Sequence, residues 1–205
     1  MSFFRQLTEK PWAPVPGVVA ELRHGAAFAV PTATLGLRLF LAVASVLFSL
    51  LIVAYHHRMA AADWRSLSEP WLLWVNTLVL VMSSVALQWA RGAARRRDID
   101  GVRSGLLVGG ACAAAFLTGQ LLAWQQLAAL GYFAATNPAV AFFYLITALH
   151  AVHLMGGLVA WGRTTAKLWR GIAVGQLRLS VELCAVYWHF LLLVWLLLFG
   201  LLLST

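Results

Sequence analysis

Three histidines and one carboxylate stand out because they lie in stretches that are otherwise almost free of charge. His150 and His153 are three residues apart, so on a helix they share a face. Glu182 and His189 are seven residues apart, which is two turns of a second helix. Neutral imidazole is the commonest metal ligand, and ionisable groups inside a membrane can carry protons. These residues could therefore form a metal or haem site, or a proton relay.

Neither chemistry has a strong pattern here. The His150 and His153 pair does not have the Glu-x-x-His spacing of di-iron bundles. Glu182 lies too far along its helix from His189 to reach the same ion, and a single carboxylate near the membrane surface is a slender basis for a proton route. A third hypothesis is that the cluster forms hydrogen bonds between helices and fixes their packing. Spacing alone favours this third hypothesis, with no catalytic residue and no metal.

Apolar stretches must position these residues. Of 205 residues, 62% are hydrophobic and 11% are charged, and about 20 mostly apolar residues suffice for a helix to cross a membrane. We therefore expect an all-α integral membrane bundle of five transmembrane helices. Residues 1–34 are predicted to be a cytoplasmic N-terminal tail, and residues 35–205 a single membrane domain. The predicted spans are about 35–55, 70–90, 105–130, 138–162 and 179–203.

The net charge of +8 is explained by topology rather than by nucleic-acid binding. Thirteen of the fifteen Lys and Arg residues fall in alternate gaps between the spans, on one side, and two fall on the other. The positive-inside rule then places the N-terminus in the cytoplasm and the C-terminus outside, in the periplasm. With this orientation His153 and His189 lie at the same depth, so the two side chains could meet.

Polar residues also mark the second and third spans. At helical spacing they form a stripe, and a polar stripe facing lipid costs free energy, so we expect it to face another helix. The residues predicted to pack helices together are Asn76, Thr77, Ser84, Gln88 and Gln120.

The last two spans resemble subunit III of haem-copper terminal oxidases. The stretch Phe142–Gly157 reads FFYLITALHAVHLMGG, and after a basic loop come Glu182 and the sequence YWHF at 187–190. The family pattern has Phe-Phe, His-Gly-x-His and a glycine, then Glu ahead of Trp-Tyr-Trp-His-Phe. The segment 74–90 is similar to another helix of the family, and the likeness covers about residues 35–203.

The resemblance implies an accessory, non-catalytic and cofactor-free subunit with the last five of the seven helices of longer members. Haem and copper then belong to partner subunits, namely catalytic subunit I and also subunit II, in a bacterial inner membrane. The family member stabilises the catalytic subunit, binds phospholipid and supports dioxygen reduction coupled to electron and proton transfer. The resemblance supports the third hypothesis, that the polar cluster fixes helix packing, and it adds Trp188 to that cluster. Arg163 and Lys167 become candidates for binding lipid headgroups.

The chain also departs from the family pattern. Many members have a carboxylate where this chain has Ser45. The family pattern has further carboxylates at the positions of Ala123 and Leu192. These losses favour a quinol-oxidase or nitric-oxide-reductase-associated branch over the best-known cytochrome c oxidases. An accessory subunit of a nitric oxide reductase is thus one alternative function, and an independent haem- or metal-binding membrane protein is another. A transporter is disfavoured, because the sequence shows no internal repeat and no proline-broken helix pair.

Overall fold

The computed structural model describes residues 31–60, 64, 71–133 and 137–204. By its internal contacts the chain divides into two units, Met1–Gly36 and Leu37–Thr205. Within the first unit the described residues are 31–36, where the first helix begins. Of the predicted tail, residues 1–34, the part up to residue 30 lies outside the described residues. The second unit contains the rest of that helix and four others.

Five long helices make up the described part of the chain, and no strand occurs in it. Each is long and apolar enough to cross a membrane, so the prediction of an all-α bundle with five transmembrane helices is confirmed. The helices are α3 (Thr32–Met59), α4 (Leu72–Arg95), α5 (Ile99–Ala129), α6 (Pro138–Trp169) and α7 (Val174–Leu203).

The helices continue past the predicted spans at their polar ends. Helix α6 runs beyond Gly162 to Trp169, and α5 begins at Ile99 rather than at Gly105. Asp98 caps α5, because its side chain accepts a hydrogen bond of 3.0 Å from the backbone of the first turn. Hydropathy marks only the part of a helix that lies in hydrocarbon, whereas capped and charged turns extend it into the headgroup region.

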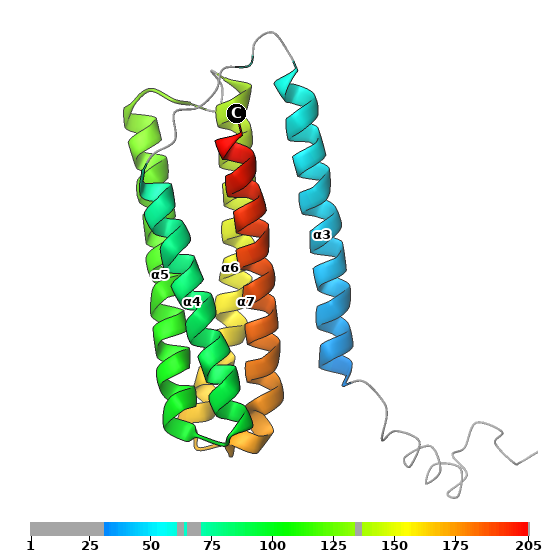
Figure 1. The fold of residues 1–205 in the computed structure, drawn as a ribbon, viewed down its shortest axis with the longest axis vertical. Helices are drawn as coiled ribbons and strands as arrows, with labels where there is room; N and C mark the ends of the chain where they lie inside the picture. The colour runs from blue at the N-terminus through cyan, green and yellow to red at the C-terminus, as the bar shows by residue number, and fades with distance from the viewer. Residues whose placement is uncertain (1–30, 61–63, 65–70, 134–136, 205) are drawn as a thin grey trace, which may run out of the picture. The chain divides into compact units, whose positions relative to one another are not determined.

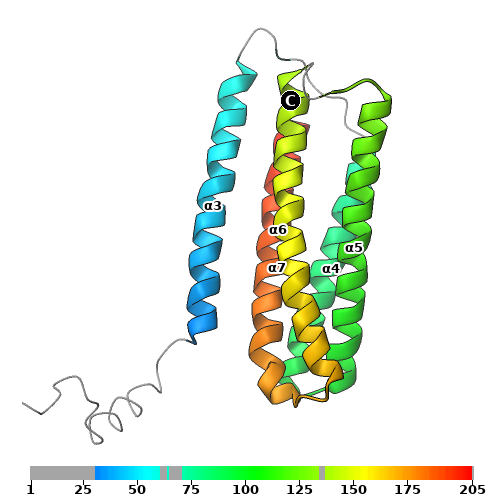
Figure 2. The ribbon, with the colours of Figure 1, turned by 180° about the vertical axis from the view of Figure 1, so that it is seen from behind.

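Helices α4 to α7 form a closed ring. Helix α4 packs against α5 and α7, and α6 packs against the same two helices. Figures 1 and 2 show that consecutive helices run in opposite directions, so each neighbour in the ring is antiparallel. The side chains that point into this ring are therefore contributed by four different helices.

Helix α3 is packed much less tightly. Its buried side chains are Ala44, Phe48 and Tyr55. The Tyr55 ring lies edge-on to Phe142 of α6, with 5.7 Å between ring centroids, and Phe48 lies beside His153 of the same helix. Aromatic contacts, spaced along one face, thus help to join α3 to the ring, beside aliphatic side chains of α3 that pack against the core.

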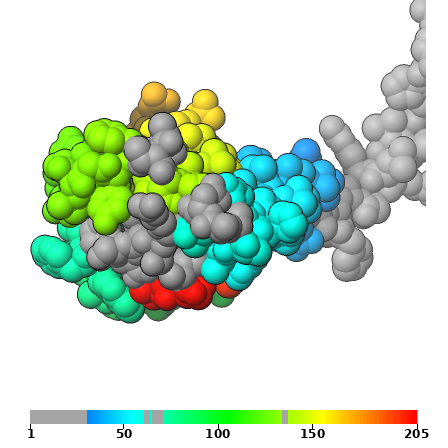
Figure 3. Space-filling view, turned by 90° about the horizontal axis from the view of Figure 1, so that it is seen from above, coloured from blue at the N-terminus to red at the C-terminus, as the bar shows by residue number. Residues whose placement is uncertain are grey.

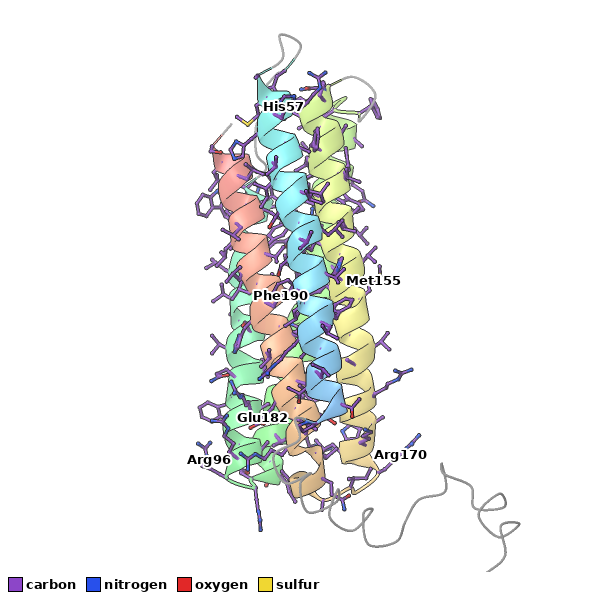
Figure 4. The ribbon with its side chains drawn as sticks, turned by 90° about the vertical axis from the view of Figure 1, so that its right-hand side faces the viewer. His57, Arg96, Met155, Arg170, Glu182 and Phe190 are labelled. Carbon is purple, nitrogen blue, oxygen red and sulfur yellow. The ribbon has the colours of Figure 1, made fainter. Side chains whose placement is uncertain are left out.

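The two ends of the second unit differ in charge. Figure 4 shows Arg96 and Arg170 at one end and His57 at the other. Figure 3 looks onto the end with His57, where the last turns of α3, α5 and α7 lie together. The end with Arg96 is called the basic end below, and its described cations include Arg95, Arg96, Arg97, Arg103, Arg163, Lys167, Arg170 and Arg178. That the basic end faces the cytoplasm stays a prediction.

Candidate functional site

A row of hydrogen bonds joins α4 to α7. Trp195 Nε1 donates to Thr77 Oγ1 at 2.9 Å, and Trp188 Nε1 donates to Ser83 Oγ at 2.8 Å. Ser83 in turn donates to the backbone oxygen of Gly109 on α5, at 2.7 Å. Both tryptophans are fully buried, so each indole N–H finds an acceptor inside the bundle. This row is called the α4–α7 seam.

His189 continues the seam toward the basic end. Its Nδ1 lies 2.5 Å from the hydroxyl of Ser84, and its Nε2 lies 3.0 Å from Oε1 of Gln88. The amide oxygen can only accept, so Nε2 carries the proton and Nδ1 accepts from the serine. Ser84 is buried, as its stripe position indicates, whereas Gln88 is exposed at the edge of the interface. Both ring nitrogens are thus engaged by side chains of α4.

Glu182 ends the seam at the basic end. One carboxylate oxygen accepts hydrogen bonds from Arg95 Nε at 3.0 Å and from Arg178 Nε at 3.4 Å. The side chain of Glu182 is 24% exposed and that of Arg95 is 52% exposed. The carboxylate is therefore held by two guanidinium groups near the surface, and Figure 4 places it well below Phe190, toward the end with Arg96. Such a partly exposed ion pair orients helices more than it stabilises them.

His150 lies in the centre of the ring. Its Nε2 is 3.1 Å from the backbone oxygen of Leu191, and its side chain is fully buried. The ring packs against Phe116 of α5 and Trp195 of α7, with centroids 5.7 and 5.1 Å away. Since a carbonyl oxygen accepts, Nε2 is the protonated nitrogen. His150 thus fixes α6 against α7 from within.

His153 faces a different neighbour. Its Nδ1 bonds to the backbone oxygen of Leu149 in its own helix at 2.8 Å, and its ring lies 5.2 Å from that of Phe48 on α3. Tyr187 of α7 donates its hydroxyl to the backbone oxygen of His153 at 2.8 Å. The expectation that His153 and His189 could meet is not fulfilled, because His189 bonds to side chains of α4 instead.

Asn76 and Gln120 occupy the interior between α4 and α5. Both are buried, and the amide of Asn76 lies where a side chain on Gly119 would stand. Among the described residues, Asn76 Nδ2 and both amide atoms of Gln120 have no hydrogen-bond partner. Gly119 therefore permits the close approach that brings these two amides inside the ring.

The three histidines and Glu182 do not converge on one point among the described residues. No group of three or more His, Cys, Asp or Glu side chains there could hold a metal ion. The three histidines point toward three different neighbours, α3, α4 and the ring interior, and Glu182 pairs with arginines. Several of the polar side chains bond from one helix to another, among them His150, Glu182 and His189. The absence of a cofactor in this chain stays a prediction.

The remaining predicted positions lie on the surface. Arg163 and Lys167 are exposed at the basic end, one turn apart on α6. Ser45, which stands where the family pattern has a carboxylate, bonds to the backbone of its own helix. It lines a hollow of about 140 Å³ between α3 and α7, together with Phe48 and Phe190.

Two contacts between α5 and α6 escaped the sequence reasoning. Trp161 Nε1 donates to the backbone oxygen of Leu106 at 2.8 Å, and Trp124 Nε1 donates to Thr147 at 3.1 Å. A signal for both was available, since a tryptophan in an apolar span needs an acceptor nearby. The acceptor itself could not be read from the sequence, because it lies on another helix.

The chain is similar to known proteins over most of its length. The family model described as cytochrome c oxidase subunit III matches residues 21–203. The chain is 30% identical to cytochrome c oxidase subunit 3 of Thermostichus vulcanus over 182 residues, 82% of this chain and 85% of that protein. It is 30% identical to the Synechocystis protein of that name over 173 residues, 80% of this chain and 72% of the other. The Corynebacterium diphtheriae protein of that name is 28% identical over 157 residues, 75% of this chain and 76% of the other.

Proposed function

The chain belongs to the cytochrome c oxidase subunit III family, and we propose that it stabilises the catalytic subunit of a bacterial haem-copper oxidase and holds phospholipid beside it. A subunit III works within an oxidase complex, together with other subunits. We assign it subunit I as direct partner and subunit II as a further member, with haem and copper in these partners. The proposed location is the bacterial inner membrane, with the basic end in the cytoplasm.

The single observation that carries the accessory role is how the polar side chains are used. His189 is engaged by Ser84 and Gln88, Glu182 is engaged by arginines, and His150 bonds to a backbone oxygen. Hydrogen bonds and ion pairs within the chain's own helices position those helices, which is the role that the proposal assigns to these groups. The reduction of dioxygen is accordingly assigned to the partner subunits.

Removal of this chain from the complex tests the stabilising role. Membranes of a strain that lacks only this chain should contain an oxidase that begins to consume dioxygen at a near-normal rate. Its activity should then decay faster during turnover than that of the complete complex. Unchanged decay in the absence of the chain would contradict the proposal, and so would a partner oxidase that assembles normally but cannot transfer electrons at all.

Two exposed cations support lipid binding. Arg163 and Lys167 lie one turn apart on the outer face of α6 at the basic end. The ion pairs found among the described residues involve Glu182 with Arg95 and Arg178, so neither α6 cation is neutralised by a carboxylate there. Two adjacent cations near the membrane surface attract an anionic headgroup.

Replacement of both cations tests lipid binding. The double variant Arg163→Gln with Lys167→Gln should retain less phospholipid after purification of the complex in detergent, measured by native mass spectrometry. The matched control, Arg96→Gln with Arg103→Gln, removes the same charge from exposed positions of the same end. Equal lipid content in both double variants and in the unmodified complex would overturn the assignment.

The same preparation identifies the electron donor. The relatives compared above are named for cytochrome c oxidase, whereas the missing carboxylates at Ser45, Ala123 and Leu192 favour a quinol or nitric oxide branch. Oxidation of reduced cytochrome c by the purified complex would support the first assignment, and oxidation of quinol or reduction of nitric oxide would support the others.

A further inference from the structure

Seven buried side-chain atoms of the described residues have no hydrogen-bond partner, and four of them belong to amide or imidazole groups of α4, α5 and α6. These four belong to three side chains, each at most 2% exposed: Asn76 on α4, Gln120 on α5 and His150 on α6. The four atoms are Asn76 Nδ2, Gln120 Oε1 and Nε2, and His150 Nδ1. Each buried polar group that lacks a hydrogen bond lowers the stability of the fold by about 1–3 kcal/mol. Four such atoms in one bundle therefore require an explanation.

Gln120 and His150 lie at the same level of the bundle. Trp124 of α5 bonds to Thr147 of α6, which fixes the register of these two helices. Gln120 is one turn before Trp124 and His150 is about one turn after Thr147. Because the helices are antiparallel, both side chains are displaced from that bond in the same direction.

The third side chain joins them from the other side. The Asn76 amide touches Gly119, the residue before Gln120. His150 packs against Phe116, which lies one turn before Gln120 on the same face of α5. Three helices therefore bring their unpartnered atoms to one level of the interior.

The unpartnered atoms have complementary hydrogen-bonding roles. His150 Nε2 donates to the oxygen of Leu191, so its Nδ1 is an acceptor, and Gln120 Oε1 is a second acceptor. The amide nitrogens of Asn76 and Gln120 are donors. Two acceptors and two donors match the two donors and two acceptors of a water molecule. Buried water commonly makes about three hydrogen bonds to otherwise unmet polar groups.

We propose that the ring interior contains a binding site for water, formed by Asn76, Gln120 and His150 and occupied by one or two molecules. Bulk solvent cannot serve these groups at this depth in a membrane, so the water is an integral part of the fold. The site explains why three strongly polar side chains are kept in a bundle whose other interior residues are largely apolar. It stands on the geometry of the ring and is independent of the proposed function.

Gln120→Met tests the site, because methionine has a similar length and volume but forms no such hydrogen bonds. If water occupies the site, the variant leaves Asn76 and His150 with fewer partners, and Tm should fall by about 3–6 °C. If the interior is dry, the variant removes two unmet polar atoms and Tm should rise, which would overturn the proposal. Unfolding of the full chain in detergent is followed by tryptophan fluorescence. The matched control is Gln125→Met, an exposed position of the same helix that should leave Tm nearly unchanged.

An electron cryo-microscopy map of the complete oxidase keeps the proposal falsifiable if the variant does not fold. The map should show ordered density within hydrogen-bond distance of the Gln120 amide and of His150 Nδ1. Direct bonds among the three side chains, with no density between them, would refute the site.

Discussion

Ser83→Ala should loosen three helices at once, because the Ser83 hydroxyl both accepts and donates in the interior. It accepts from Trp188 Nε1 at 2.8 Å and donates to the Gly109 oxygen at 2.7 Å. A typical hydrogen bond contributes about 0.5–1.5 kcal/mol, and those measured between membrane helices average about 0.6 kcal/mol. Two such bonds, one of which leaves the buried Trp188 N–H without its acceptor, give a loss of about 1–3 kcal/mol, or a Tm lower by about 2–12 °C.

The assay is reversible unfolding of the full chain in mixed detergent micelles, followed by tryptophan fluorescence. Ser104→Ala is the matched control, since Ser104 is exposed and bonds only to the backbone of its own helix. Its effect on the free energy of unfolding should stay within about 0.5 kcal/mol. A double-mutant cycle with Trp188→Phe should give a coupling free energy of about 0.5–1.5 kcal/mol. Equal effects of Ser83→Ala and the control, together with strict additivity in the cycle, would refute the seam as a stabilising contact.

Two further substitutions test the packing of α6 and the ion pair at the basic end. A Cβ on Gly157 would stand 2.9 Å from the Trp188 ring, so Gly157→Ala should lower the free energy of unfolding by about 1–3 kcal/mol. A Cβ on Gly156 meets open space, so Gly156→Ala should be neutral or stabilising. Equal thermal unfolding of the two variants would contradict the close approach of Gly157 to Trp188. Glu182→Gln removes the partly exposed pair with Arg95, so the free energy of unfolding should fall by less than about 1 kcal/mol, and less at high salt. A large loss that persists at high salt would show that the carboxylate does more than pair with arginines.

The five crossings could be predicted because each apolar stretch is long and each is bounded by charge. The ends of the helices could not, since α6 continues to Trp169 through a turn that contains Arg163 and Lys167. Nothing in hydropathy distinguishes a charged helical turn from a charged loop. Local capping decides the end, and it depends on backbone geometry that apolar patterning does not contain.

The direction of a polar side chain could not be predicted from its spacing. Rise per residue places His153 and His189 at similar depth, and spacing places Thr77 and Ser84 on one face. Which helix a face meets depends on how the helices rotate against each other, and that is set by the packing of the whole ring. In the structure, His153 faces α3 and His189 faces α4. Each imidazole contacts a residue that is far away in the sequence, Phe48 for His153 and Ser84 for His189.

The absorption spectrum of the affinity-purified chain tests the central claim most directly. Purified from its own membranes in mild detergent, the chain should bring down a partner with the spectrum of a haem-copper oxidase. Expressed and purified alone, it should show no Soret band. A Soret band in the isolated chain that disappears in His150→Ala or His153→Ala, with no oxidase partner recovered from the native membranes, would contradict the assignment as an accessory subunit.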